Sequence, residues 1–295
     1  MHIDQEQDPR TRGPRPPFDE KTQGPPGEER KMRVKPDHGE TSYRGSDRLL
    51  DKVALVTGAD SGIGRAVALA FAREGADVAI SYLDEHEDAK ETQRLVEEAG
   101  RRALMLPGDL ADSSFCEAIV AKTVEELGHV DIIVNNAAVQ GKTVESISEL
   151  TTDRLERTFK VNILAMFHIV RRALRDMKPG GTIINTGSIQ AYQPKASILD
   201  YATTKAAIVG FTKGLALETI ERGIRVNCVA PGPVWTPLIP QSFEGEKLEK
   251  FGQQSPTKRP AQPAELAPAY VFLASADSSF VNGEVLGVTG GAPLA

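Results

Sequence analysis

From Lys52 onward, short apolar runs alternate with amphipathic stretches of helix length. This alternation is typical of repeated β-strand, α-helix, β-strand units, whose strands are parallel and buried on both faces. No linker interrupts the series, so the sequence predicts one α/β domain over residues 48–295, with a Rossmann-type doubly wound sheet of seven parallel strands. The expected strands are 53–57, 77–82, 103–107, 131–135, 181–187, 225–230 and 284–288. The expected helices lie near 63–74, 85–99, 113–127, 153–177, 199–222 and 263–274.

A glycine-rich turn follows the first expected strand. Glycines at such a turn permit positive φ angles and let backbone N–H groups approach a pyrophosphate at the helix N-terminus. The spacing differs from G-x-G-x-x-G, and a turn of this kind can also serve only to pack a helix closely on a sheet. Its place after the first strand favours a nucleotide site. The contacts expected from this turn are Gly58, Asp60, Ser61, Gly62, Ile63 and Gly64.

Tyr201 and Lys205 stand four residues apart in an expected helix, so their side chains lie on one face. A nearby positive charge favours the phenolate and lowers the pKa of a tyrosine from its usual ~10. We therefore expect Lys205 to lower the pKa of Tyr201, which then serves as general acid or base for an alcohol and its carbonyl. Tyr and Lys also fall at this spacing by chance, so the inference depends on the other motifs.

Three motifs in this order resemble the short-chain dehydrogenase/reductase family, over residues 48 to 295. They are Thr57-Gly58-x3-Gly62-x-Gly64, Asn135-Asn136-Ala137-Ala138 and Tyr201-x3-Lys205. The N-terminal segment, together with residues 188–194 and 252–256, further resembles bacterial stress-associated or glucose/ribitol-dehydrogenase-like oxidoreductases. The resemblance implies an NAD(P)-dependent oxidoreductase that interconverts an alcohol and a carbonyl in an aldehyde, ketone, polyol or sugar.

The resemblance also implies roles for the catalytic residues. Ser188 would hydrogen-bond the substrate oxygen, Tyr201 would exchange its proton, and Lys205 would hold the cofactor ribose. Asn162 would mark a bend in its helix that holds a water linking Lys205 to solvent. The alternatives are a surface serine at 188 and a satisfied buried amide at 162.

In this family the end of the second strand selects the cofactor. An acidic residue there accepts hydrogen bonds from the ribose of NAD, whereas basic residues bind the extra phosphate of NADP. Tyr82 occupies that place, with Leu83 beside it and Asp84 two residues later. No Lys or Arg occurs at 60, 61 or 81–89, although Arg65 and Ser81 could still meet a phosphate. The sequence favours NAD and leaves NADP open.

The resemblance adds contacts farther along the chain. Asp109 and Leu110 would lie at the adenine edge, unless Asp109 only caps a turn. Asn136 and Ala137 would pass near the cofactor, with Asn136 mainly tying the sheet together. The loop expected over the nicotinamide supplies Pro231, Gly232, Val234 and Thr236. Residues 237–260 are expected to form a mobile lid. The candidates for lining the substrate pocket, each of which could equally be loop packing, are Gln190, Tyr192, Gln193 and Trp235.

Residues 1–47 form a charged N-terminal extension that holds seven of the 19 prolines. The segment offers few large apolar side chains and cannot fold alone. It is either a flexible tail or an extended arm packed on its own body or on a neighbouring subunit. The anchors of such an arm would be Phe18, Met32, Val34 and Tyr43.

The remaining composition excludes several classes of function. A net charge of −6 and a pI near 5.5 argue against nucleic-acid binding. Cys116 and Cys228 lack disulfide or metal-ligand spacing, and no apolar run approaches the ~18 residues of a membrane helix. We expect a cytoplasmic enzyme that acts on a small molecule and, by resemblance, forms a homotetramer. The alternative is a non-catalytic dinucleotide-binding protein with a structural or sensing role.

Overall fold

The computed structural model describes residues 8–294. Seven parallel strands form one sheet in the order β3-β2-β1-β4-β5-β6-β7, which confirms the predicted fold class. The chain reverses direction across the sheet between β1 and β4, the kind of switch point where such sheets bind ligands. The strands are β1 Val53–Thr57, β2 Asp77–Tyr82, β3 Ala103–Pro107, β4 Ile132–Asn135, β5 Thr182–Thr186, β6 Arg225–Pro231 and β7 Val285–Val288.

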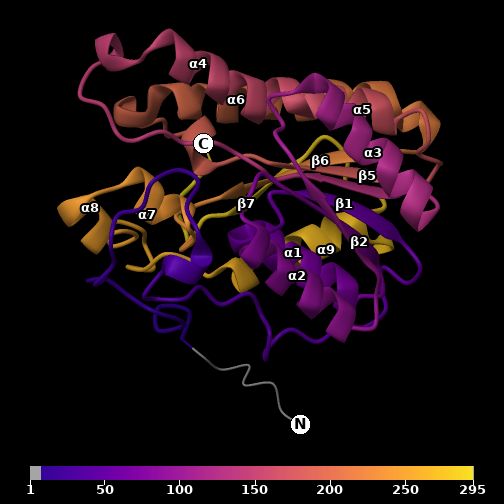
Figure 1. Ribbon diagram of the computed structural model, residues 1–295, viewed down its shortest axis with the longest axis horizontal. Coiled ribbons are helices and arrows are strands. Elements are labelled where there is room, and N and C mark those ends of the chain that lie inside the picture. The colour runs from indigo at the N-terminus through magenta and orange to yellow at the C-terminus, as the bar shows by residue number, and fades with distance from the viewer. Residues whose placement is uncertain (1–7, 295) are drawn as a thin grey trace.

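Helices cover both faces of the sheet (Figure 1). One layer consists of α1 Gly62–Arg73, α2 His86–Glu98 and α9 Pro263–Ala274. The other consists of α3 Ser113–Leu127, α4 Thr152–Phe159, α5 Ala165–Ala173 and α6 Leu199–Thr219. Each layer encloses its own hydrophobic cluster against the sheet, so every central strand is buried on both faces.

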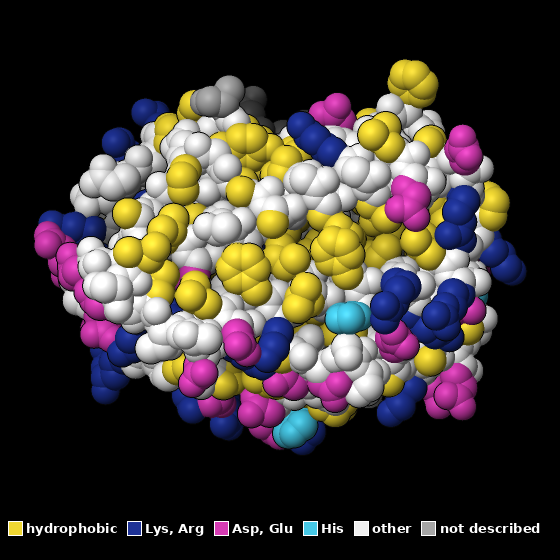
Figure 2. All heavy atoms as spheres, turned by 90° about the horizontal axis from the view of Figure 1, so that it is seen from above, with side chains coloured by type: hydrophobic (Ala, Val, Ile, Leu, Met, Phe, Trp, Pro, Cys, Tyr) yellow, Lys and Arg dark blue, Asp and Glu magenta, His cyan; other side chains and the backbone are white. Residues whose placement is uncertain are grey.

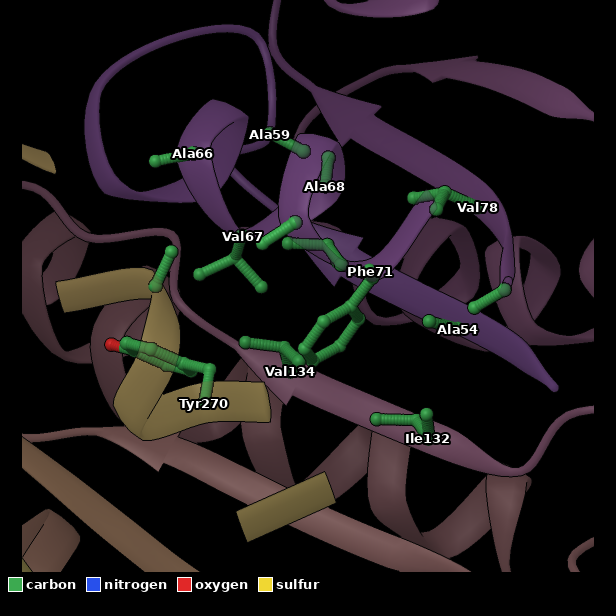
Figure 3. Packing of buried hydrophobic residues seen from close by; sticks show 14 of the residues in the cluster. Ala54, Ala59, Ala66, Val67, Ala68, Phe71, Val78, Ile132, Val134 and Tyr270 are labelled. Carbon is green, nitrogen blue, oxygen red and sulfur yellow. The ribbon is translucent and has the colours of Figure 1, made fainter. Parts of the chain in front are cut away.

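The packing of α1 fixes the turn that precedes it. Figure 3 shows Phe71 of α1 reaching towards Val134 and Ile132 of β4, with Tyr270 of α9 nearby. All four side chains are fully buried. Truncating a buried phenylalanine to alanine typically costs about 3–5 kcal/mol. The N-terminus of α1 is therefore held at the carboxyl edge of β1.

The helix expected over residues 153–177 is two helices with a π-helical turn between them. The turn spans Lys160–Leu164 and joins α4 to α5. π-Helical turns are uncommon and often lie at functional sites. The other predicted elements have the observed bounds or differ from them by one to three residues at an end, which is the usual uncertainty of helix and strand boundaries.

The segment expected as a lid contains two short helices, α7 Leu238–Ser242 and α8 Gly245–Glu249. Its mobility stays a prediction. No helix among residues 8–294 is both long enough and apolar enough to cross a membrane.

Residues 8–47, which we call the N-terminal arm, lie along the body of the molecule. Phe18 and Met32 are buried in a cluster that also includes Trp235, with Val34 packed beside it. Tyr43 packs on the core under α1 and donates a 2.5 Å hydrogen bond to Glu74. Of the two arrangements that the sequence left open, the structure has the docked arm for residues 8–47; residues 1–7 lie outside the described part.

Candidate active site

A cavity of about 1170 Å³ opens at the carboxyl edge of the sheet, between the glycine-rich turn, the start of α6 and the lid segment. Single drug-sized ligands usually occupy about 300–1,000 Å³. The space therefore suits a dinucleotide together with a small substrate. Among the described residues, no cluster of His, Cys, Asp and Glu has the geometry of a metal site.

The glycine-rich turn has the shape that a pyrophosphate requires. Gly58 and Gly62 have φ angles of +62° and +52°, and both line the cavity. The N-cap residue Ser61 uses no side-chain hydrogen bond to close the first turn of α1. The positive end of that helix thus faces the cavity, where an anionic group is stabilised.

Gly64, the last residue expected to contact the cofactor from this turn, does not line the cavity. A Cβ atom at this position would lie 1.9 Å from the carbonyl oxygen of Gly58. Gly64 is therefore required for close packing of α1 against the turn, and its contact with a cofactor stays a prediction.

The end of the cavity next to β2 is acidic. Asp60, Tyr82, Leu83 and Glu85 line it. Burial raises the pKa of the Asp60 carboxyl, and the neighbouring Glu85 carboxylate raises it further. Carboxyl groups accept hydrogen bonds from hydroxyl groups and, when ionised, repel a phosphate.

The two residues left open as phosphate partners do not reach this end. The Arg65 guanidinium is buried, donates to the carbonyl oxygens of Asp60 and Asp88, and forms an ion pair with Glu29 of the arm. Ser81 is fully buried within β2. Neither lines the cavity, so the described residues offer no cation there at the turn or on β2.

Asp109 and Leu110 also line the cavity, and their contact with the adenine stays a prediction. Arg157 of α4 forms an ion pair with Asp109 at 2.6 Å, and the N–H of Ala111 donates to the same carboxylate. These contacts hold the pKa of Asp109 below its usual value despite partial burial. Arg157 also lines the cavity, and sequence reasoning missed it because its partner lies 48 residues away.

Ser188, Tyr201 and Lys205 meet on one wall of the cavity. Ser188 caps a short 3₁₀ turn, its hydroxyl accepting a hydrogen bond from the N–H of Gln190. Tyr201 and Lys205 lie one turn apart near the start of α6, and the Lys205 Nζ lies 5.3 Å from the centre of the tyrosine ring. The Nζ donates a 2.8 Å hydrogen bond to the carbonyl oxygen of Thr186.

The expected lowering of the Tyr201 pKa by Lys205 is wrong for the protein without a cofactor. Burial raises the pKa of Tyr201 to about 12, opposed only by a hydrogen bond with Ser188. Burial also lowers the pKa of Lys205 to about 8. Removing both groups from water thus outweighs the attraction that the spacing alone suggested.

Asn162 lies in the π-helical turn, behind the wall instead of on it. Its side chain accepts from the N–H of Val139 and donates to the carbonyl oxygen of the same residue and to Thr204, which follows Tyr201 on α6. The amide is 1% exposed. It therefore joins the loop after β4 to α6, and it does not line the cavity.

Asn136 and Ala137 line the cavity and also tie the sheet edge together. The Asn136 side chain donates to the carbonyl oxygens of Thr57 and Gly58, while the Thr57 hydroxyl accepts from the N–H groups of Asn136 and Ala137. The turn after β1 is thereby fastened to the end of β4.

The loop after β6 contributes all four residues expected from it. Pro231, Gly232, Val234 and Thr236 line the cavity. Trp235 was wrongly placed at the substrate, because its side chain points away and stacks on Phe18 with ring centres 3.9 Å apart.

Among the other candidates for substrate contact, Gln190 and Gln193 line the cavity, but Tyr192 does not. The direction of a loop side chain depends on local backbone angles, and the sequence does not show which side chains face inward. Several lining residues lie in loops or the arm and carried no motif: Pro25, Pro26, Gly27, Gln140, Thr143 and Lys195.

The class that this fold and cavity define is the α/β oxidoreductases that work with a nicotinamide dinucleotide. Residues 58–293 match the family model described as enoyl-(acyl carrier protein) reductase. The chain belongs to the short-chain dehydrogenase/reductase family, which confirms the resemblance, and it is an NAD(P)-dependent oxidoreductase.

Relatives and solved structures agree with this assignment. The glucose and ribitol dehydrogenase of Daucus carota is 50% identical over 92% of this chain and 96% of its own length. The chloroplastic NADPH-dependent aldehyde reductase 1 of Arabidopsis thaliana is 48% identical over 92% and 97%. A short-chain dehydrogenase from Burkholderia cenocepacia, solved in complex with NADP, superposes with a TM-score of 0.78 at 35% identity over 83% of this chain and 98% of its own.

Proposed function

We propose that the protein interconverts an alcohol and a carbonyl with Tyr201 as general acid and base. The observation that carries this proposal is the meeting of Ser188, Tyr201 and Lys205 on one wall of a cavity that also contains the glycine-rich turn. A proton donor, a hydroxyl donor and an ammonium then converge where a substrate oxygen would lie.

In the reducing direction, the Ser188 hydroxyl donates a hydrogen bond to the carbonyl oxygen, and Tyr201 gives its phenolic proton to the developing alkoxide. In the oxidising direction, Tyr201 takes that proton back. A bound nicotinamide supplies or accepts the hydride and, when oxidised, carries a positive charge. Lys205 holds the ribose hydroxyls and favours the phenolate. Asn162 fixes the position of α6 and serves as a positioning residue, through Thr204.

The cavity fits a dinucleotide along its length. The N-terminus of α1 would hold the pyrophosphate, and the Asp109–Leu110 side would hold the adenine. By the family resemblance, the loop after β6 would cover the nicotinamide. Val234 and Thr236 of this loop line the cavity, and Thr236 also adjoins the pyrophosphate turn, because a Cβ atom on Gly62 would meet it at 3.0 Å.

We infer a preference for NAD over NADP. Two observations support this preference. Asp60 and Glu85 place carboxyl groups where the second phosphate of NADP would lie, and Arg65 is already paired with Glu29, so that phosphate would meet carboxyl groups instead of cations. The NADP bound to the Burkholderia enzyme favours the other cofactor. Steady-state rates with both cofactors decide between them.

The substrate class that we propose is polyhydroxylated. The cavity has polar side chains in its wall that suit the hydroxyls of a sugar or polyol: Gln140, Thr143, Gln190, Gln193 and Lys195. The carrot relative, named a glucose and ribitol dehydrogenase, supports the same substrate class. The test is a screen of sugars, polyols, aldehydes and ketones with each cofactor. Tight cofactor binding without turnover of any compound would instead favour the non-catalytic sensing role.

We also propose a homotetramer. The face that carries α4, α5 and α6 shows hydrophobic side chains gathered across its middle (Figure 2). Large apolar residues are exposed along these helices and the π-helical turn: Leu155, Phe159, Leu164, Phe167 and Leu217. Second copies of the chain would cover them. Analytical ultracentrifugation would measure the oligomeric state.

We also propose that the protein is cytoplasmic, because its two cysteines form no disulfide.

A further inference from the structure

The N-terminal arm runs from the lid segment to the glycine-rich turn. Phe18 stacks on Trp235, the N–H of Gln23 donates to the carbonyl oxygen of Pro240, and the N–H of Gly27 donates to the Gln241 side chain at 2.8 Å. The indigo ribbon in Figure 1 passes α7 and α8 and continues below α1 and α2. One segment thus contacts both sides of the cavity.

The arm also forms part of the cavity wall. Pro25, Pro26 and Gly27 line it beside residues 60–62 and Gln241. At Gly27, a Cβ atom would lie 2.4 Å from the carbonyl oxygen of Pro237, so only glycine allows this close approach to the lid. The wall next to the expected pyrophosphate is therefore built partly by residues of the arm, outside the α/β body.

Beyond the wall, Glu29 reaches the glycine-rich turn itself. Its carboxylate accepts a 3.1 Å hydrogen bond from the N–H of Gly62, the first residue of α1, and pairs with the buried guanidinium of Arg65. His38 of the arm contacts the same carboxylate through Nε2 at 3.0 Å. Glu29 is 5% exposed and Arg65 4%, so each buried charge depends on the other.

A second carboxylate holds Glu29 in place. Asp88 of α2 accepts from the N–H of Glu29 at 2.7 Å and from the N–H of Arg30 at 3.1 Å. The arm is therefore fastened to the body on both sides of the turn that binds the dinucleotide. Without Glu29, Arg65 would lose its closest counter-ion and Gly62 its acceptor, and the first turn of α1 would no longer be held.

We propose that the N-terminal arm is a working part of the dinucleotide site and that Glu29 is the positioning residue through which it fixes the phosphate-binding turn. This inference rests on the proposed cofactor site. The arm fastens the lid to the turn, so docking of the arm and binding of the dinucleotide reinforce each other.

The variant that tests this is Glu29→Gln, which keeps the shape and removes the charge that pairs with Arg65. The matched control is Glu28→Gln, whose carboxylate pairs only with the exposed side chains of Arg30 and Lys31. Calorimetry with NAD and NADP gives the dissociation constant, and steady-state rates with the best substrate separate the cofactor KM from kcat.

We expect Glu29→Gln to weaken cofactor binding about three- to thirtyfold, with the larger effect on KM than on kcat, and Glu28→Gln to bind as the wild type does. A folded Glu29→Gln protein with wild-type affinity overturns the inference. Absence of cofactor binding by the wild type would instead overturn the proposed function.

Hydrogen exchange on the wild-type protein tests the coupling between arm docking and cofactor binding, and it does not depend on whether a variant folds. If the arm favours cofactor binding, the cofactor must favour the docked arm to the same degree. The amides of Glu29 and Arg30, which donate to Asp88, should then exchange at least about threefold more slowly with saturating cofactor. Exchange at an unchanged rate overturns the inference.

Discussion

The Nζ atom of Lys205 lies 5.3 Å from the centre of the Tyr201 ring while it donates a hydrogen bond to the carbonyl oxygen of Thr186. The helix α6 fixes this spacing, but burial decides the pKa values of the two groups in the free protein. The two side chains are thus already in position in the protein without a cofactor. The proposed mechanism needs the positive charge of an oxidised cofactor to lower the pKa of Tyr201, so that its phenol can lose a proton.

Burial of Lys205 predicts a specific pH dependence of stability. The folded pKa of about 8 lies below the usual 10.5, so between these values the unfolded chain binds more protons, and stability rises with pH. Relative to Lys205→Met, the unfolding free energy of the wild type should rise by up to about 3 kcal/mol from pH 8 to 10.5. Urea unfolding across this range measures the difference. Relative to Lys213→Met, which replaces an exposed lysine of α6, the unfolding free energy of the wild type should show no such rise. A wild-type stability that does not rise relative to Lys205→Met would contradict the account.

Cofactor selection is expected to respond to Glu85. Glu85→Arg replaces a carboxylate with a cation at the β2 end of the cavity, where a second phosphate would lie. The ratio of kcat/KM for NADP to that for NAD should rise about tenfold, because a phosphate gains a charge-assisted partner. Glu87→Arg, on the exposed start of α2 and outside this cavity, serves as the control. A wild-type enzyme that strongly prefers NADPH would disprove the inferred preference.

Docking of the arm is expected to be strongest between about pH 4.5 and 6.5. Burial alone would lower the pKa of His38, but its contacts with Glu29 and Glu40 raise it above 6.5, so its contribution is complete below 6.5 and is lost as pH rises through the folded value. Despite burial, His38 lowers the pKa of Glu40 from 4.5 to about 2, so that contribution is complete above 4.5 and is lost as pH falls towards 2.

Trp235, the only tryptophan of the chain, stacks on Phe18 and reports this docking by its fluorescence. Each pKa unit by which folded His38 exceeds 6.5 should add about 1.4 kcal/mol to the unfolding free energy below pH 6.5, as measured by urea titration. His38→Gln should remove the loss above pH 6.5, and His129→Gln, at a half-exposed site next to Asp131, should not. An unfolding midpoint that stays constant from pH 6 to 9 would count against the arrangement.

The strands and the catalytic wall could be predicted because their signals are local. A buried parallel strand is apolar over its whole length, and the Tyr201–Lys205 spacing needs only that the segment be helical. Ser188 then follows from its place after β5. For these residues, the backbone geometry of one or two elements determines where the side chain lies.

The arm and the loop contacts could not be predicted in this way. Trp235 binds the carbonyl oxygen of Val34, 201 residues earlier, and Glu29 meets Arg65 only after the chain has folded. The sequence predicts that Phe18 anchors the arm, but it does not predict that Phe18 packs on Trp235. The direction of the side chains at Tyr192 and Trp235 depends on loop backbone angles that no residue pattern encodes, and the pKa of Tyr201 depends on how deeply the fold buries it.

The central claim is that Tyr201 carries the proton, and Tyr201→Phe tests it most directly. With the best substrate from the screen, kcat should fall about 10²- to 10⁴-fold, because general acid–base catalysis contributes that much. The dissociation constant of the cofactor should change by less than about threefold, since the phenol contributes little to binding. Tyr192→Phe, outside the cavity, should stay active. A Tyr201→Phe enzyme that keeps more than about a tenth of the wild-type turnover would contradict the account.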